Sequence, residues 1–291
     1  MKIVDALRGP EPAFSFEFFP PKDAEGVERL FETAAELRRY KPTYVSVTYG
    51  AGGSTQQLTV ELVRRIKAEL NLEAMAHLTC VGASQAELRE VLQQLREARI
   101  ENVLALRGDP PKGETAFVPH PDGFANASEL AGFAAAGFDF CLAGACYPEK
   151  HPEAPSLEED LLQLKKKVDA GVQFLISQLF FDNRDYFAFV DKARALGIQV
   201  PIVAGIMPIT NVAQVKRFTQ MCGATIPPAL LARLEIATDP AEVRAIGVEH
   251  ATAQCRELLA GGAPGIHFYT LNRSLATREI LDNLRQAGLA R

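Results

Sequence analysis

Short apolar runs of β-type composition alternate along this sequence with longer segments of helical periodicity, and this alternation constrains the fold more than any other feature. The runs are rich in Val, Ile, Phe, Tyr and Thr, and most of them end at Gly, Pro or Asp. Between them, apolar residues recur with the spacing of amphipathic helices. Because the runs are continuously apolar, they predict a parallel sheet covered by helices. Candidate strands begin near Phe14, Thr43, Glu73, Asn102, Phe138, Gln173, Val200 and Gly265.

Eight strand–helix units favour closure into a (β/α)8 TIM barrel over an open, doubly wound α/β sheet. The candidate strands recur about every 30 residues until the seventh, and the last interval is about twice as long. That interval predicts extra helices between strands seven and eight, at residues 211–221, 227–237 and 240–260. Barrels of this class commonly use about 250 residues as one domain. We therefore expect a single catalytic domain over residues 1–291.

Composition excludes several classes of partner. The formal net charge is -5, whereas nucleic-acid binding usually needs a basic excess, so we expect no nucleic-acid partner. Five cysteines at wide spacing without a CxxC pattern argue against a disulfide framework and a structural zinc site. The N-terminal segment lacks the apolar core of a signal peptide, and the most apolar stretch, 130–148, is interrupted by Asp139. We expect no membrane association and a cytoplasmic location.

Active sites of β/α barrels lie at the carboxyl ends of the strands, so polar residues at those ends are candidates for function. Glu17 lies within the first apolar run, FSFEFF, among four phenylalanines. An anion is costly to bury in such surroundings, and desolvation favours the protonated form that an acid catalyst needs. The alternative is a structural carboxylate that forms a salt bridge inside the barrel.

Two further strand ends allow both a functional and a structural interpretation. Asp109 ends the fourth run in LRGDPP, where it could face a ligand beside Arg107 and Gly108 or form the turn. His77 could face the site or be a core histidine. The strand ends carry neither the paired histidines of a metal-dependent hydrolase nor the lysine of a Schiff-base enzyme. The remaining acidic, amide, arginine and aromatic residues suit a bulky heteroaromatic ligand and proton or hydride chemistry.

Ten short motifs occur in an order that resembles the catalytic domain of methylenetetrahydrofolate reductases: FSFEFFPPK, SVTYGAGGS, AHLTC, ALRGD, YPEKHPEA, KKKVDAG, QLFFD, GIMPI, RFTQMCGATIP and HFYTLNRS. The resemblance covers roughly Phe14 to Arg273, nearly the whole chain. It implies a barrel with noncovalently bound FAD, an NADH or NADPH electron donor, and a ping-pong reduction of methylenetetrahydrofolate to 5-methyltetrahydrofolate. It also implies a role in one-carbon metabolism and methionine biosynthesis, a homo-oligomer, and the absence of the large C-terminal regulatory domain of eukaryotic relatives.

The resemblance also assigns roles to residues of this chain. It implies that Glu17 is the catalytic acid and that Asp109 supplies a negative charge near the flavin and the pterin. It implies folate or nicotinamide contacts for Gln178, Phe218 and Arg273. It changes the interpretation of His77 and of the lysine run, which alone would suggest a solvated helix face. The flavin contacts it implies are Thr48, Tyr49, His77, Arg107, Gly108, Asp109, Ala125, Tyr147, His151, Asp160, Gln163, Lys166 and Lys167.

Some residues depart from the pattern of the family. Phe124 stands where relatives often have tyrosine, Gln163 stands where some have asparagine, and the loop after the second strand is unusually rich in glycine. Two other hypotheses stay open at this point. One is a catalytically idle folate- or flavin-binding barrel that acts as a partner subunit. The other is a metal-dependent aldolase-type lyase, which fits the fold but not the strand ends.

Overall fold

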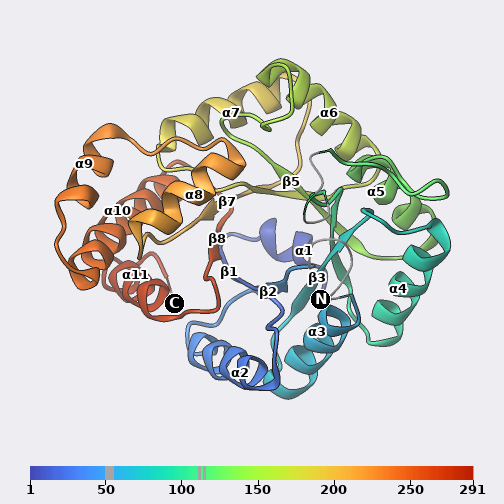
Figure 1. Cartoon of the computed structure of the whole chain (residues 1–291), viewed down its shortest axis with the longest axis horizontal. Coiled ribbons are helices and arrows are strands. Elements are labelled where there is room, and N and C mark those ends of the chain that lie inside the picture. Colours follow the sequence, from blue (N-terminus) through green and yellow to red (C-terminus); the bar gives the residue numbers. More distant parts are fainter. Residues whose placement is uncertain (50–55, 111–112, 114–115, 291) are drawn as a thin grey trace.

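The computed structural model describes residues 1–49, 56–110, 113 and 116–290, and its eight parallel strands form a closed barrel. Each strand pairs with the next along the chain, and β8 pairs with β1, so the predicted (β/α)8 fold is confirmed (Figure 1). The strands are β1 (Ala13–Phe18), β2 (Tyr44–Val47), β3 (Ala74–Thr79), β4 (Asn102–Leu106), β5 (Cys141–Cys146), β6 (Phe174–Ser177), β7 (Ile202–Ile206) and β8 (Gly265–Tyr269).

The helices surround the barrel, and those expected between β7 and β8 are present with nearly the predicted bounds (Figure 1). Two details differ from the sequence prediction. The fifth strand begins at Cys141 rather than near Phe138, and a short N-terminal helix was not expected. The helices are α1 (Ile3–Leu7), α2 (Ala24–Arg38), α3 (Gln56–Leu70), α4 (Gln85–Glu97), α5 (Ala127–Gly137), α6 (Leu157–Asp169), α7 (Asn183–Ala195), α8 (Val212–Cys222), α9 (Pro228–Ile236), α10 (Pro240–Ala260) and α11 (Leu275–Gln286).

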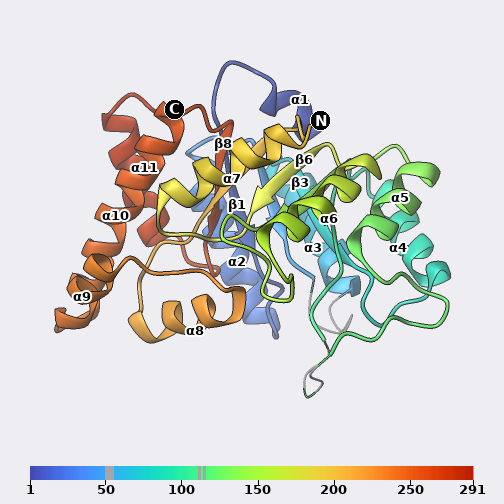
Figure 2. The ribbon, with the colours of Figure 1, turned by 90° about the horizontal axis from the view of Figure 1, so that it is seen from above.

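The alternation of side chains along each strand divides the core into two layers. Outward-facing residues such as Phe16 and Phe18 join the large cluster between sheet and helices. Inward-facing residues such as Tyr44 and Phe174 join a second cluster inside the barrel, to which the α1 residues Ile3, Val4 and Leu7 also belong. Helix α1 therefore packs against the barrel interior, and it lies at the opposite end from α8 (Figure 2).

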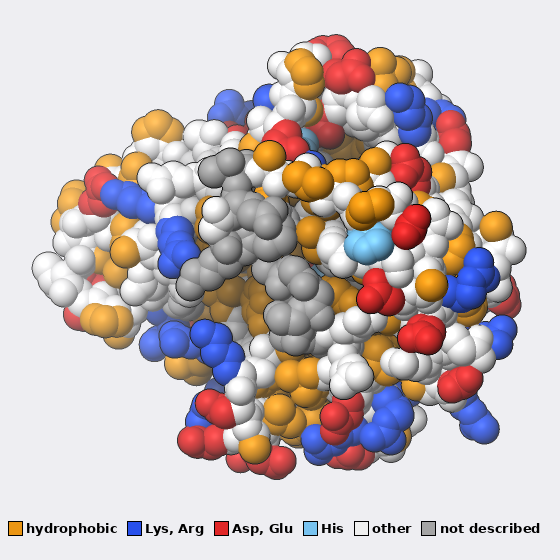
Figure 3. All heavy atoms as spheres, turned by 45° about the vertical axis from the view of Figure 1, so that its right-hand side comes forward, with side chains coloured by type: hydrophobic (Ala, Val, Ile, Leu, Met, Phe, Trp, Pro, Cys, Tyr) orange, Lys and Arg blue, Asp and Glu red, His pale blue; other side chains and the backbone are white. Residues whose placement is uncertain are grey.

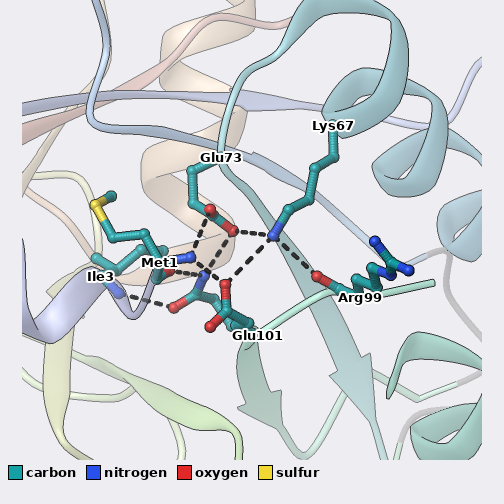
Figure 4. A network of polar contacts seen from close by, with 7 residues as sticks. Met1, Ile3, Lys67, Glu73, Arg99 and Glu101 are labelled. Carbon is teal, nitrogen blue, oxygen red and sulfur yellow. Dashed lines mark hydrogen bonds and ion pairs between the residues drawn. The ribbon is translucent and has the colours of Figure 1, made fainter. Parts of the chain in front are cut away.

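Polar contacts at the amino-terminal ends of β3 and β4 hold α1 in place (Figure 4). The fully buried Asn102 accepts a hydrogen bond from the Ile3 backbone N–H (2.8 Å) and donates to the Met1 carbonyl (2.9 Å) and to Glu73 (3.1 Å). Lys67 donates to the same glutamate (3.0 Å). Because these residues come from the N-terminal segment, α3, the start of β3 and β4, the network closes the end of the barrel that faces away from the strand carboxyl ends.

The described surface has an ordinary mixed character. Acidic and basic side chains are interspersed on the face shown in Figure 3, with hydrophobic side chains between them. All five cysteines are free thiols. Among the described residues, no helix combines the length and apolar character needed to cross a bilayer.

We predict that Asn102→Ala destabilises the protein by about 2 kcal/mol, because the buried Ile3 N–H and Met1 carbonyl lose their partner. Urea unfolding measures this change. As a control, Gln93→Ala removes a half-buried side chain that bonds Glu97 on the same helix and should cost less than about 0.5 kcal/mol. Equal losses in the two variants would contradict the role of Asn102.

Candidate functional site

Glu17 lies inside the barrel near the carboxyl end of β1, and it is almost completely buried. Its Oε2 lies 3.4 Å from Nε2 of His267 on β8 and 3.5 Å from Nε2 of His77 on β3. The other ring nitrogen of His267, Nδ1, lies 2.8 Å from the Ser15 hydroxyl. A His267 ring with its proton on Nε2 satisfies both contacts, because it donates to Glu17 and accepts from Ser15.

The physical reason given for Glu17 in the sequence analysis was wrong. Its phenylalanine neighbours Phe16 and Phe18 point outward into the core between sheet and helices, since successive side chains of a strand alternate. Phe19 follows the strand and is 38% exposed. The Glu17 carboxylate is thus surrounded by inward-facing polar groups. It is buried against the imidazole rings of His77 and His267, and not against phenylalanine rings.

His77 is 5% exposed, and burial lowers its pKa to about 4, although the Glu17 carboxylate opposes this shift. The ring is therefore neutral at pH 7, and its 3.5 Å contact with Glu17 is a polar contact rather than an ion pair. Within the described residues, His77 Nε2 and the Thr79 hydroxyl, both on β3, and the Ser46 hydroxyl on β2 are buried without a hydrogen-bond partner of good geometry. A group of such atoms at one end of a barrel suits a polar ligand.

Tyr269 and Gly205 complete the described part of the interior beside Glu17. The Tyr269 hydroxyl donates to the Ser177 carbonyl (2.7 Å), and its ring meets the edge of His267 at 5.4 Å. A Cβ atom at Gly205 would lie 2.8 Å from the Tyr269 ring and 2.1 Å from the Ser177 oxygen. Glycine is therefore required at position 205 for the tyrosine to lie across the barrel.

The loops after β4 and β5 are joined by a bidentate ion pair. Arg107 donates to both carboxylate oxygens of Glu153, at 2.5 and 2.8 Å, and lies over the Phe117 ring at 5.0 Å. The hydrogen bonds from Arg107 hold the pKa of Glu153 below its usual range. Gly108 has a φ of +89°, and a Cβ there would lie 2.7 Å from Val81, so only glycine fits. Asp109 follows and is exposed.

Tyr147 connects several of the predicted residues. Burial raises its pKa to about 12, and the negative charge of Asp109 acts in the same direction. A hydrogen bond between the Tyr147 hydroxyl and Gln178 acts in the opposite direction and lowers the pKa. Its ring lies 4.6 Å from that of His151, whose backbone N–H donates to Asp160 on α6 (2.8 Å). The structure thus brings these five predicted residues together at the carboxyl ends of β4, β5 and β6.

The lysine run on α6 divides between two environments. Lys166 is exposed and donates to Gln163 (3.3 Å) on the same helix. Lys167 instead reaches the carboxyl end of β5, where its Nζ donates to the Ala145 carbonyl (2.7 Å), and burial lowers its pKa. Lys167 therefore lies beside the Tyr147 loop, whereas Lys166 and Gln163 lie on an exposed part of the helix.

The remaining predicted residues lie on other parts of the barrel rim. Thr48 follows β2, and its backbone N–H donates a hydrogen bond to the Phe18 carbonyl. Tyr49 packs against the large cluster between the sheet and the helices. Ala125 is exposed beyond β4. Phe218 on α8 packs on the apolar cluster that links α8, α9 and the ends of β6 and β7, and Arg273 is exposed after β8. The glycine-rich segment 50–55, singled out in the sequence, lies outside the described residues.

Three residues of this site were not predicted from the sequence: Ser15, Glu153 and His267 as a functional residue. Two of them could have been found by applying strand alternation to both partners of the β1–β8 pair, where Ser15 lies opposite His267, two residues before Glu17 and Tyr269. Glu153 lies in a loop, and no periodicity points to it.

Phe124, which departs from the family pattern, has a clear structural place. Its ring is buried and packs on the Phe133 ring at a centroid distance of 5.1 Å.

Two grooves are present on the surface of the described residues. A groove of about 630 Å³ lies between α10 and α11, and one of about 450 Å³ lies between α2 and the turn after β8. The first is lined by helix surfaces on the outside of the barrel, whereas the second is lined by α2 and by the turn that carries Asn272 and Arg273. Neither contains Glu17, His77 or Tyr147. The buried polar groups at the strand ends are therefore the better indicator of the site.

The lowered pKa of His77 predicts a pH dependence of stability. Between the unfolded value of 6.5 and the folded value of about 4, the unfolded chain binds the proton more readily, so stability falls as pH falls. From pH 7 to pH 5 the His77 contribution should lose about 2 kcal/mol. Urea unfolding at both pH values should show a smaller loss in His77→Gln; an identical loss in the two proteins would contradict this assignment.

Comparison with known proteins agrees with the fold. A family model described as methylenetetrahydrofolate reductase matches residues 2–285. The 5,10-methylenetetrahydrofolate reductase of Escherichia coli (strain K12) is 40% identical over 261 residues, which cover 89% of this chain and 86% of that protein. Methylenetetrahydrofolate reductase (NADH) 1 of Arabidopsis thaliana is 42% identical and covers 98% of this chain.

The matches differ in how much of each relative is covered. The chain spans about half the length of the plant and fungal relatives, 51% for the Arabidopsis protein. Among solved structures, a Clostridium thermocellum protein described as binding two copies of 5-methyl-5,6,7,8-tetrahydrofolic acid has a TM-score of 0.64. It covers 98% of this chain and 97% of its own, but at 16% identity it shows the fold alone. The family match and the E. coli relative together show that this chain belongs to the methylenetetrahydrofolate reductase family.

Proposed function

We propose that the chain is an FAD-dependent 5,10-methylenetetrahydrofolate reductase that produces 5-methyltetrahydrofolate in a ping-pong reaction with a reduced nicotinamide. The observation that carries the proposal is Glu17, a carboxyl group buried at the carboxyl ends of the strands and placed between two imidazoles. A proton donor inside the barrel mouth is what ring opening of the folate needs. Family membership supplies the substrate class.

The residues of the site fit a flavin. His77 Nε2 and the Thr79 hydroxyl are buried polar atoms that form no hydrogen bond of good geometry among the described residues, and they can pair with the polar edge of a heteroaromatic ring. Arg107 and Lys167, at the carboxyl ends of β4 and β5, are the basic side chains that would contact the pyrophosphate of the flavin. We assign the flavin to the rim at the carboxyl ends of β2 to β5. When bound, FAD supplies the carrier that takes hydride from the nicotinamide and passes it to the folate.

The residues of the chain then have distinct tasks. Glu17 donates a proton to N10 of the methylene folate, so that the bond between N10 and the methylene carbon breaks, the five-membered ring opens and a 5-iminium cation forms. His267 orients the carboxyl through its Nε2, and Ser15 fixes the ring from the other side. Asp109 provides a negative charge that stabilises the cation. Tyr147 and Gln178, in contact at the same strand ends, border the substrate.

The opposite side of the mouth provides the remaining contacts. Phe218 offers an aromatic face to nicotinamide or to the folate side chain, and Arg273 offers an exposed guanidinium to the glutamate carboxylate of folate. The plant relatives are named as NADH enzymes, which supports NADH as the donor. Assembly of this chain as a homo-oligomer is a prediction that rests on the family alone.

We predict that Glu17→Gln lowers the rate of folate reduction by at least about 100-fold, because the amide cannot donate the required proton. Flavin reduction by NADH should stay within about twofold of the wild type, since that half-reaction needs no general acid. Stopped-flow absorbance of the flavin measures both half-reactions. Glu28→Gln, at an exposed position on α2, is the matched control. Equal slowing of both half-reactions in Glu17→Gln would refute the acid role.

We predict that Asp109→Asn slows the folate half-reaction more than the nicotinamide half-reaction, by about tenfold, because the cation loses a neighbouring negative charge. The same stopped-flow comparison measures it. A variant that reduces folate at the wild-type rate would remove Asp109 from the mechanism. A purified protein that takes up no FAD would overturn the flavin assignment itself.

A further inference from the structure

The turn after β8 is attached to the end of β1 by one side chain. The Asn272 carboxamide accepts a hydrogen bond from the Phe19 backbone N–H (2.8 Å) and donates one to the Phe19 carbonyl (2.8 Å). Both backbone polar groups of one residue are thus satisfied by one amide. Thr270, two residues earlier, donates from its hydroxyl to the Glu17 carbonyl (2.5 Å).

These contacts extend the β1–β8 pair beyond its last backbone partners. The ladder ends where Glu17 lies opposite Tyr269. From there on, the side chains of Thr270 and Asn272 take the place of the neighbouring strand. The segment of β1 that follows the buried carboxyl is therefore held on the β8 side by three side-chain hydrogen bonds.

The backbone of the turn is unusual. Leu271 and Asn272 both have positive φ, 51° and 57°, and the Arg273 N–H donates to the Thr270 carbonyl (2.9 Å). Asparagine tolerates this left-handed conformation, but for leucine it is strained. Such strain persists only where the surroundings impose it, and it is common at functional sites. The double hydrogen bond to Phe19 anchors the residue that follows Leu271 in this turn.

The turn joins two groups that the proposed reaction requires. On one side it contacts the strand end that carries Glu17, and on the other it ends at the exposed Arg273. These residues are more than 250 positions apart in the sequence, so only the fold brings them together. A fixed turn sets the position of the guanidinium relative to the carboxyl.

We propose that Asn272 is a positioning residue, which aligns the proton donor Glu17 with the carboxylate-binding Arg273 by clamping the backbone of Phe19. This role rests on the proposed function, because it presumes that one substrate contacts both groups. The amide itself faces Phe19 and has no assigned contact with substrate.

Asn272→Gly tests the clamp, since glycine adopts the positive φ without strain and removes only the two hydrogen bonds. We expect the folate half-reaction to slow about tenfold and the KM for folate to rise, while flavin reduction by NADH stays within about twofold. The pH profile of the folate half-reaction should also shift, because the carboxyl loses its fixed surroundings. Asn272→Asp keeps the acceptor for the Phe19 N–H and should lie between glycine and the wild type.

Asn71→Gly is the matched control. Asn71 has nearly the same backbone conformation, with φ of 51°, but it is exposed after α3 at the other end of the barrel. If it affects folate kinetics as strongly as Asn272→Gly, the clamp is refuted. Equal slowing of both half-reactions in Asn272→Gly would also refute it, because general loosening would explain that result.

Hydrogen–deuterium exchange separates this proposal from the proposed function. Peptides that cover residues 16–20 and 268–274 should exchange at least about tenfold faster in Asn272→Gly than in the wild type or Asn71→Gly. This readout needs neither substrate nor flavin. If the wild type reduces no methylenetetrahydrofolate, the proposed function fails whatever the exchange shows; if exchange in these peptides is unchanged, the clamp itself fails.

Discussion

The structure depends on burying one carboxylate inside a closed barrel. Strand alternation turns Glu17 inward, and closure of the sheet removes it almost completely from water. Such a group must find polar partners, and here they come from both sides, His77 on β3 and His267 on β8. Ser15 and Tyr269 in turn contact His267. The polar interior is therefore a connected network at the end where barrel chemistry takes place.

The two ends of the barrel solve different problems. At the amino-terminal end, α1 packs on the apolar interior, and Asn102 and its partners close the structure. At the carboxyl end, long-range side-chain contacts join loops that the strands alone leave separate. Arg107 joins the loop after β4 to Glu153 after β5, and Asn272 joins the turn after β8 to the end of β1. One end therefore provides stability, whereas the other holds the residues of the candidate site in position.

Much of this architecture could be predicted from the sequence, for identifiable physical reasons. Apolar runs and helical periodicity indicate which residues are buried locally, so the eight strands and the helices before β8 were predicted correctly. The five-residue helix α1 is too short to show a periodic pattern, and it was not predicted. Glu17 was identified as buried, but its neighbours were assigned wrongly, because adjacent residues in a strand face opposite sides. The contacts of Glu153 and Asn272 depend on loop geometry, which short-range patterns do not encode.

A crystal structure of the flavin-loaded protein with 5-methyltetrahydrofolate tests the central claim most directly. The account predicts that the pterin ring lies in the mouth at the carboxyl ends of the strands, with N10 of the folate within hydrogen-bond reach of the Glu17 carboxyl, directly or through one water. A pterin bound in the groove between α10 and α11, or in the mouth but beyond the reach of Glu17, would contradict it.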